Sequence, residues 1–401
     1  MNVHEDVRKR DKKFFGRGKP VMELEVTKVK GSFIYDAEGK EYVDFLGGAG
    51  VGNLGWDKEE IENVLRKNDR PSYVYPNFYY KPWTELAEIL ANITPGELSK
   101  SFRVTGGSEA VDASLLIAMM YTGRKKFLSL EGSYHGNTIG ALSVASSSNR
   151  KKFPNLLSEC EKIETPLNEE ALNKVEDQLK NNEVAAFIME PIVSNLGVII
   201  PKEKFMSKLA EICKTHGTLL IMDEAVTGFG RTGKLFATEY YDIKPDIMIM
   251  AKALSAGHEG IGAVITTPEV AEKVEGKVGL YSSYGWHPTS TDVAIKTMHY
   301  ILKNKDKIFK NISDKSEIFE EELSKIDFGK EIELRIKGLT IGIDVKDEEF
   351  ASKIQESCLK HGLLINIQGS SLVLFPPMNI DSLTVTKGID LLNKSVQNLH
   401  T

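Results

Sequence analysis

Short apolar runs alternate with helical patterns through the middle of the chain. Apolar runs of this length predict strands that are covered on both faces of a sheet. Strand, helix and strand at this spacing predict right-handed parallel crossovers. We therefore expect an α/β fold with a large, mostly parallel sheet wrapped by helices. The runs are KKFLSLEGSYHG (125–136), VAAFIMEPIV (184–193), GTLLIMDEAV (217–226) and DIMIMAKAL (246–254).

A helix is predicted between the second and third runs, in KEKFMSKLAEICKTHG. The helical period places Phe205, Leu209, Ile212 and Cys213 on one face, and Gly217 marks the C-terminal end. Ligands in such sheets bind beyond the carboxyl ends of the strands. Residues that carry chemistry should therefore gather at that edge.

The two flanks of the chain have different patterns. GSFIYDAEGKEYVDFLGG (31–48) predicts a hairpin that turns at Glu38-Gly39. ELRIKGLTIGIDV (333–345) has the alternation of a strand with one wet face, and a final helix is expected from 382 to 399.

These patterns suggest that the two chain ends together form a smaller α+β domain. Residues 1–55 would contribute to this small domain, 56–295 would form the large domain, and 296–401 would complete the small one.

Composition excludes several classes of function. The net charge of −6 gives no general attraction to nucleic acids or acidic membranes, and no apolar run is long enough to span a bilayer. Charges fill the N-terminal segment where a secretory signal would be apolar. Three widely spaced cysteines favour a reduced, cytoplasmic protein, and the eight histidines show no metal-ligand spacing.

Lys252 follows directly on the apolar run IMIMA. Lysine is seldom buried without a partner, so either the strand surfaces there or the amine is covalently occupied. A partly desolvated lysine has a lowered pKa and a nucleophilic neutral amine, as Schiff-base formation requires.

Two glycines precede a helical pattern in VTGGSEAVDASLLIAMM (104–120), with Glu109 in the first turn. Free N–H groups and the helix dipole can hold a phosphate there. Gly107 admits a close approach, and Ser108 adds a hydroxyl. An ordinary helix cap is the alternative.

Tyr134 and Asp223 follow two other predicted strands. Tyr134, in SYHGNT, offers a flat face for a ring, although it could be a core tyrosine beside the turn at Gly136. Asp223 ends a buried run, so its carboxylate needs a positive partner. That partner is either a protonated heteroaromatic nitrogen or a structural salt bridge, with Arg231 as the candidate.

One ligand accounts for all four features at this sheet edge. The phosphate of pyridoxal 5'-phosphate (PLP) needs an anion cradle, its ring needs a stacking surface, its pyridinium nitrogen needs a carboxylate, and its aldehyde condenses with lysine.

The chain resembles the class III PLP-dependent aminotransferases, the family of the ornithine and 4-aminobutyrate enzymes. The similarity runs nearly end to end. The matching motifs are DFLGGAGVGNLG (44–55), GGSEA, YHGNTIGALS, MEP, DEAVTGFGRTGKLFA, AKALS, YGWHP (284–288) and RIKGLTIGI (335–343). The resemblance implies fold type I and ping-pong transfer of an amino group, through a Lys252 Schiff base, between an amine or amino acid donor and a keto acid or aldehyde acceptor.

The resemblance also implies residue roles. Lys252 would bind PLP and move protons, Asp223 would keep the ring nitrogen positive, and Glu190 would lie near cofactor and substrate. Ser283 would reach the phosphate of a second subunit, which implies a homodimer with shared active sites. The other cofactor-binding residues implied are Gly107, Ser108, Tyr134 and Val226.

Several positions depart from the family pattern. Asn137, and Val373 or a close neighbour, stand where relatives carry arginines that grip substrate carboxylates. Ala225-Val226 replaces the commoner Val-Gln pair, and Asn195 replaces a second glutamate. These departures disfavour ornithine or 4-aminobutyrate and favour a more neutral or apolar amine, or an unusual acid. Candidate substrate residues are Phe78, Asn137 and Trp286, with Val51, Trp56, Tyr79 and His287 as further wall candidates.

Two alternatives remain at this level. The same scaffold hosts aminomutases, racemases and lyases, and EPIVSNLGVIIP is similar to a stretch of glutamate-1-semialdehyde aminomutases, whereas GFGRTGKLFA is more like the aminotransferases. A non-catalytic binding protein is the other alternative. Retention of both Lys252 and Asp223 argues against it.

Overall fold

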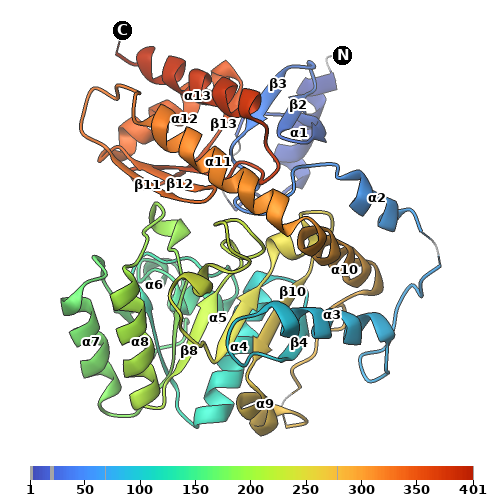
Figure 1. Ribbon diagram of the computed structural model, residues 1–401, viewed down its shortest axis with the longest axis vertical. Helices are drawn as coiled ribbons and strands as arrows, with labels where there is room; N and C mark the ends of the chain where they lie inside the picture. Colours follow the sequence, from blue (N-terminus) through green and yellow to red (C-terminus); the bar gives the residue numbers. More distant parts are fainter. Residues whose placement is uncertain (1–2, 19–21, 68, 278, 401) are drawn as a thin grey trace.

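The computed structural model describes residues 3–18, 22–67, 69–277 and 279–400 (Figure 1). A seven-stranded sheet has the order β4-β10-β9-β8-β7-β5-β6, and β10 alone runs antiparallel to its neighbours. The strands are β4 (Lys100–Val104), β5 (Lys126–Leu130), β6 (Cys160–Ile163), β7 (Val184–Met189), β8 (Leu219–Asp223), β9 (Ile247–Met250) and β10 (Gly262–Thr266). The expected mostly parallel sheet is confirmed.

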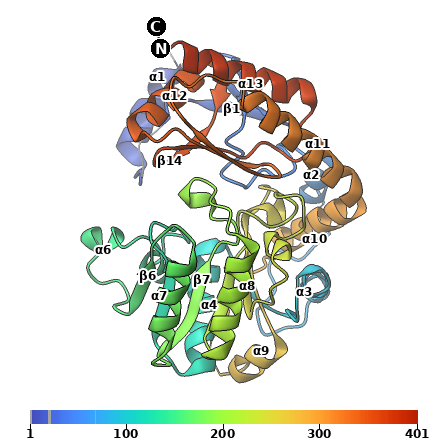
Figure 2. The same cartoon turned by 60° about the vertical axis from the view of Figure 1, so that its left-hand side comes forward.

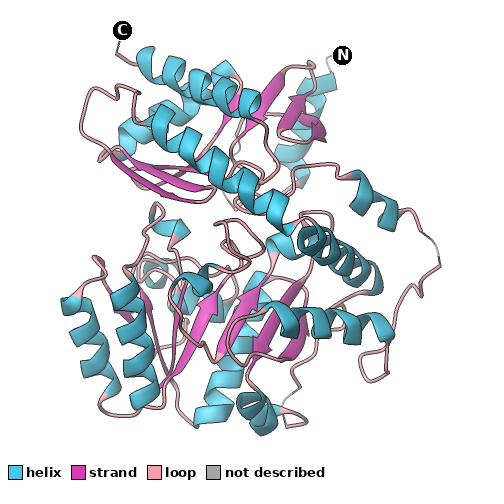
Figure 3. Ribbon diagram, in the orientation of Figure 1, coloured by secondary structure: helices cyan, strands magenta, loops and turns pink. Residues whose placement is uncertain are grey.

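Helices cover both faces of this sheet because its central strands are apolar on both sides (Figure 3). In β8, Ile221 packs toward α4 (Gly107–Thr122), whereas Leu220 and Met222 pack toward α7 (Glu169–Leu179) and α8 (Glu203–Thr215). Every residue of β7, β8 and β9 is buried. The four predicted runs are β5, β7, β8 and β9, each of which ends at the same edge of the sheet.

Helix α8 follows the predicted pattern. Phe205, Leu209 and Cys213 are buried on its inner face. Gly217 lies just beyond the helix with φ +59°, a backbone conformation that glycine adopts without strain.

The upper part of the molecule contains two four-stranded sheets (Figure 2). The first has the order β1-β2-β3-β13 and the second β11-β12-β15-β14. The strands are β1 (Val26–Lys30), β2 (Phe33–Asp36), β3 (Glu41–Asp44), β11 (Glu333–Lys337), β12 (Thr340–Asp344), β13 (Leu363–Leu364), β14 (Asn366–Gln368) and β15 (Ser371–Leu374). The predicted N-terminal hairpin is β2 and β3, which pair antiparallel around the turn at Gly39.

The prediction of a single strand over 333–345 is wrong. The segment is a hairpin of β11 and β12, and β12 is buried over most of its length. Gly338 makes the turn with φ +58°, and a Cβ there would clash with the backbone of Thr232. The alternating pattern continues through the turn, so periodicity by itself does not reveal it.

Segments from both chain ends share one sheet, because Leu363 and Leu364 of β13 pair parallel with β3. The exact boundaries of the two expected domains stay a prediction. The final helix, α13, ends two residues before the expected Leu399. The remaining α-helices are α1 (Val3–Phe14), α2 (Glu59–Leu65), α3 (Lys81–Ile93), α5 (Ile139–Val144), α6 (Asn149–Lys152), α9 (Pro268–Val274), α10 (Pro288–Lys303), α11 (Lys305–Leu323), α12 (Glu348–His361) and α13 (Ser382–Gln397). Among the described residues, no helix combines the length and apolarity needed to cross a bilayer.

Candidate active site

A cavity of about 420 Å³ lies at the carboxyl ends of β7, β8 and β9, beside the first turn of α4. It is the place that the parallel sheet predicts for a ligand. Seven residues proposed from the sequence line it: Gly107, Ser108, Tyr134, Glu190, Asp223, Val226 and Lys252.

Lys252 begins a short 3-10 helix (Lys252–Ser255) directly after β9. Its backbone has φ +46°, a left-handed conformation that costs a non-glycine residue about 1–3 kcal/mol. Burial lowers the pKa of the Lys252 amine, and the nearby carboxylates of Glu190 and Asp223 oppose this effect. The lowered pKa increases the neutral, nucleophilic fraction of the amine.

Asp223 ends β8 with a buried carboxylate. Its Oδ2 lies 2.8 Å from Nδ1 of His135, and its Oδ1 accepts the N–H of Ala225 at 3.0 Å. The alternative salt bridge to Arg231 is wrong, because that guanidinium instead donates to Asn53 and to two backbone carbonyls. A pairing of His135 with Asp223 was not predicted, although His135 adjoins Tyr134 in the quoted SYHGNT motif.

The start of α4 forms an open cradle. Gly106 is the N-cap, and a Cβ at this position would meet nothing within 4 Å. The first N–H groups of a helix lack intrahelical partners and attract anions. The hydroxyl of Ser108 accepts the N–H of Asn137 at 3.1 Å, and the carboxylate of Glu109 accepts the N–H of Thr105 at 2.6 Å. The cradle therefore presents backbone donors and one hydroxyl.

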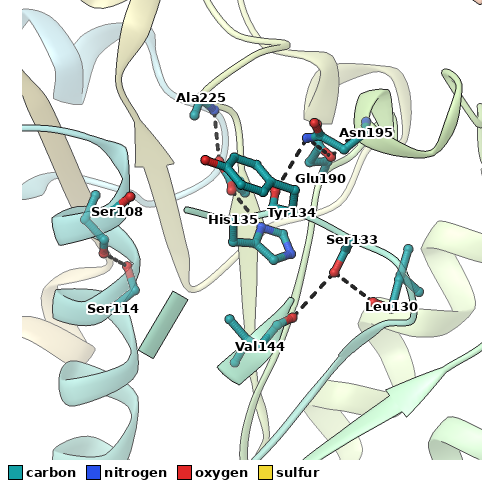
Figure 4. Close-up of polar contacts among 12 residues, drawn as sticks. Ser108, Ser114, Leu130, Ser133, Tyr134, His135, Val144, Glu190, Asn195 and Ala225 are labelled. Carbon is teal, nitrogen blue, oxygen red and sulfur yellow. Dashed lines mark hydrogen bonds and ion pairs between the residues drawn. The ribbon is translucent and has the colours of Figure 1, made fainter. Parts of the chain in front are cut away.

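Glu190 directly follows β7 and is 2 % exposed. Burial and the carboxylate of Asp223 raise its pKa, while donated hydrogen bonds oppose the shift. These bonds come from the Ser194 hydroxyl and from Nδ2 of Asn195, which lies 2.9 Å from Oε1. Figure 4 shows Tyr134, His135, Glu190 and Asn195 gathered at this edge.

The proposed substrate residues are less concentrated than the cofactor residues. Val51 lines the cavity, and Nδ2 of Asn137 donates to the Tyr134 hydroxyl at 2.9 Å from outside the lining. Trp286 is buried, donates from Nε1 to the Gly262 carbonyl at 2.8 Å and does not line this chain's cavity, so its role in binding substrate stays a prediction.

Other proposed residues also lie away from this chain's cavity. Phe78 and Tyr79 are exposed on the surface, Trp56 lines a neighbouring hollow, and His287 contacts the Ser72 carbonyl. Ser283 is exposed and does not line the cavity. Within one chain, Phe78 and Ser283 therefore do not reach the site. Lining residues that the sequence did not single out are Thr105, His135, Ala251, Gly257, Glu259, Gly260 and Ile261.

The residues present fit PLP. The α4 cradle suits a phosphate, the buried Asp223 carboxylate suits a protonated ring nitrogen, and the Lys252 amine suits the aldehyde. The described residues contain no cluster of three or more side chains able to hold a metal ion.

Comparisons with known proteins agree with this chemistry. The family model of class III aminotransferases matches residues 14–396. An acetylornithine aminotransferase of Archaeoglobus fulgidus is 36 % identical over 367 residues, covering 90 % of this chain and 93 % of the relative. A chloroplastic gamma aminobutyrate transaminase of Solanum lycopersicum is 31 % identical over 416 residues, covering 91 % and 80 %.

Solved structures have the same fold. The ornithine aminotransferase of Toxoplasma gondii superimposes with a TM-score of 0.91 at 25 % identity, covering 100 % of this chain and 96 % of that one. A transaminase from the marine bacterium Virgibacillus gives 0.92 at 24 % identity, covering 98 % and 99 %. The aminomutase, racemase, lyase and non-catalytic alternatives are not favoured by these relatives. The chain belongs to the class III aminotransferase family, and it is a PLP-dependent enzyme of fold type I that transfers amino groups.

Proposed function

We propose that this enzyme takes its amino group from a neutral or apolar primary amine, and that Lys252 binds the cofactor and moves the proton. The observation that carries the proposal is the placement of Lys252, with its lowered pKa, and Asp223 on one cavity. Bound PLP supplies an aldehyde for the amino group and an electron-withdrawing ring.

Each lining residue has a defined part in this proposal. Asp223 holds the positive charge of the ring nitrogen, and His135 orients that carboxylate. Gly107 and Ser108 hold the phosphate, and Tyr134 covers the ring. The neutral Lys252 amine removes a proton from the donor carbon and returns it, because it is the nucleophilic base on the cavity wall.

The chemistry of the wall supports a donor without a carboxylate. Lys252 is the one Lys or Arg side chain on the described lining, and it is committed to the cofactor. Val373, at the position of an expected arginine, is fully buried in an apolar cluster with Val198, Val226 and Phe375. A substrate carboxylate would therefore find no guanidinium among the described residues that line the cavity. The relatives' names mention acetylornithine and gamma aminobutyrate, and these compounds are assigned to those proteins alone.

The proposal includes a homodimer with shared sites. Exposed aromatic side chains gather where residues 71–80 meet residues 281–287: the rings of Tyr73 and Tyr284 lie 6.2 Å apart, and Phe78 is 66 % exposed. Exposed apolar groups of this kind favour a protein interface. Ser283 lies in the second segment, so a second copy could bring its hydroxyl to the cradle.

We also propose a cytoplasmic location. Cys160, Cys213 and Cys358 are free and buried, which suits a reducing compartment. Fractionation of cells that express the protein, followed by detection of the chain and of a cytoplasmic marker, tests this location.

The covalent part of the proposal is tested by borohydride reduction of the PLP-loaded protein and peptide mapping. Lys252 should carry the reduced cofactor. Lys162 is a matched control, because burial lowers its pKa to about 8 but its Nζ lies against Ser129, away from the cavity. Labelling of Lys162, or equal labelling of the Lys252→Ala variant, would reject the assignment.

The substrate part needs a separate assay. Amines with and without a carboxylate are added to the loaded enzyme without acceptor, and the change in cofactor absorbance is followed. Neutral amines should react well, and 4-aminobutyrate and acetylornithine poorly. A faster reaction with either carboxylate donor would overturn the proposed donor class while leaving amino transfer intact.

A further inference from the structure

The loop between β7 and α8 connects the catalytic wall to the small C-terminal sheet. We call residues 193–199 the Glu190 loop, because two of them contact Glu190, which itself lies just before the loop. Val193 and Ile199 close its base through two backbone hydrogen bonds of 2.9 and 3.1 Å. A short 3-10 helix (Ser194–Leu196) forms its tip.

One side of the Glu190 loop touches the active site. Ser194 and Asn195 both donate to the carboxyl of Glu190, and Nδ2 of Asn195 also lies 3.5 Å from the Tyr134 carbonyl. Glu190, Asn195 and Tyr134 line the same cavity. Any shift of this loop would therefore change the hydrogen bonds of a buried carboxyl group.

The other side of the loop is bound by Arg335 of β11. Its Nη1 donates to the Gly197 carbonyl at 3.0 Å. Two contacts with Glu333, at 2.9 and 2.7 Å, and one with Asp344, at 3.3 Å, hold the same guanidinium. A planar fork fixed by two carboxylates has little freedom, so the carbonyl of Gly197 is held at a defined position.

The packing around this contact leaves no spare room. Gly197 has φ +74°, and a Cβ there would clash with Oγ of Ser371 in β15. A Cβ on Gly342 in β12 would clash with the carbonyl oxygen of Gly197. The two strands of the small sheet therefore lie directly against the loop, and the loop cannot move toward them.

We propose that Arg335 is a positioning residue for amino transfer, which fixes the Asn195 carboxamide and the Glu190 carboxyl by holding the Gly197 carbonyl. The inference rests on the proposed role of Glu190 beside the cofactor. Arg335 itself does not line the cavity, so it acts through the Glu190 loop.

Removal of the guanidinium leaves the Gly197 carbonyl without its charged donor and frees the loop tip. Asn195 then donates less well to Glu190, whose ionised form becomes harder to maintain in its buried place. The Glu190 carboxylate favours a positive charge on the Lys252 nitrogen. A less ionised Glu190 should therefore lower the pH midpoint at which the absorbance of the lysine-bound cofactor changes.

The test compares Arg335→Ala with Lys346→Ala in the PLP-loaded enzyme. Lys346 contacts the same two carboxylates, at 3.0 Å to Glu333 and 3.3 Å to Asp344, but it is half-exposed and makes no contact with Gly197. Two readouts are the single-turnover rate with an amine donor and the pH midpoint of the cofactor absorbance.

Arg335→Ala should slow the single turnover by about 3- to 30-fold and move the absorbance midpoint to lower pH. Lys346→Ala should change neither, and Arg335→Lys should restore part of both. Equal effects of the two alanine variants would overturn the proposal, because a role limited to the surface ion pairs would be shared.

A double-mutant cycle identifies the route. Asn195→Ala should reproduce both effects of Arg335→Ala, and the combination should add little to either. Fully additive effects would reject the route through the loop. Glu190→Gln separates this failure from a failure of the proposed site: if it changes neither readout, the role of Glu190 is wrong, whereas a strong effect of Glu190→Gln with none from Arg335→Ala rejects the positioning role alone.

Discussion

His135 and Asp223 form a buried pair on the wall of the cavity, with Nδ1 of the imidazole 2.8 Å from Oδ2 of the carboxylate. The other imidazole nitrogen, Nε2, is buried and has no hydrogen-bond partner among the described residues. The contact with Asp223 is therefore the one hydrogen bond of this imidazole among the described residues, and it orients the Asp223 carboxylate. This hydrogen bond connects the buried Asp223 carboxylate to the segment that carries Tyr134.

The first prediction concerns this pair. His135→Phe removes the partner of the Asp223 carboxylate and should weaken PLP binding by about 10- to 150-fold, since a hydrogen bond to a charged group contributes about 1.5–3 kcal/mol. Titration of the apo-protein with PLP, followed by absorbance, measures the change. His258→Phe is the matched control, because His258 forms a similar pair with Glu62 at 2.7 Å but does not line the cavity. A larger loss of affinity in the control would contradict the assignment.

The second prediction uses the lowered pKa of Lys252. In the folded apo-protein the amine binds its proton less tightly than in the unfolded chain, so protonation favours unfolding. Lys252→Met should therefore stabilise the apo-protein at neutral pH, by about 1.4 kcal/mol for each unit of the pKa shift. The gain should shrink as the pH rises from the folded pKa through the unfolded one of about 10.4. Denaturant unfolding at several pH values checks this, and a gain that does not depend on pH would contradict it.

The third prediction concerns the close approach at Gly197. Gly197→Ala adds backbone strain at φ +74° and a clash with Ser371, and should destabilise the protein by about 2–4 kcal/mol. Gly123→Ala is a matched control, since Gly123 has φ +70° but open space around a Cβ. It should cost only about 1–2 kcal/mol of strain. Denaturant midpoints of the two variants give the comparison, and equal losses would show that the contact with the small sheet is loose.

The fourth prediction tests the shared site by complementation. Ser283→Asp places a negative charge where the phosphate of the PLP bound by the second subunit is proposed to lie. Lys252→Ala removes the amine that binds the cofactor. Each variant should be inactive by itself, but subunit exchange should restore about a quarter of the wild-type activity, because half of the dimers are mixed and each has one intact site. Activity of the mixture is the measurement. No recovery, with exchange confirmed by mass, would place Ser283 in its own chain's site.

Much of the candidate site could be predicted because strand ends are encoded locally. Apolar runs that end at Glu190, Asp223 and Lys252 predict buried parallel strands. Parallel strands bring their carboxyl ends to one edge of the sheet. Gly107 follows the same logic, since a glycine before a helical pattern marks a helix start. These residues meet in one cavity for reasons that are visible within a few positions of each.

The tertiary structure alone decided the contacts between distant segments. His135 finds Asp223 across 88 positions, and Arg335 finds the Gly197 carbonyl across 138. No local period specifies such pairs, because they depend on how whole elements pack and on where glycines let backbones approach. The same reason explains the error over the 333–345 hairpin: a strand pattern indicates that a segment is covered, whereas the partner that covers it is decided only when the sheets come together.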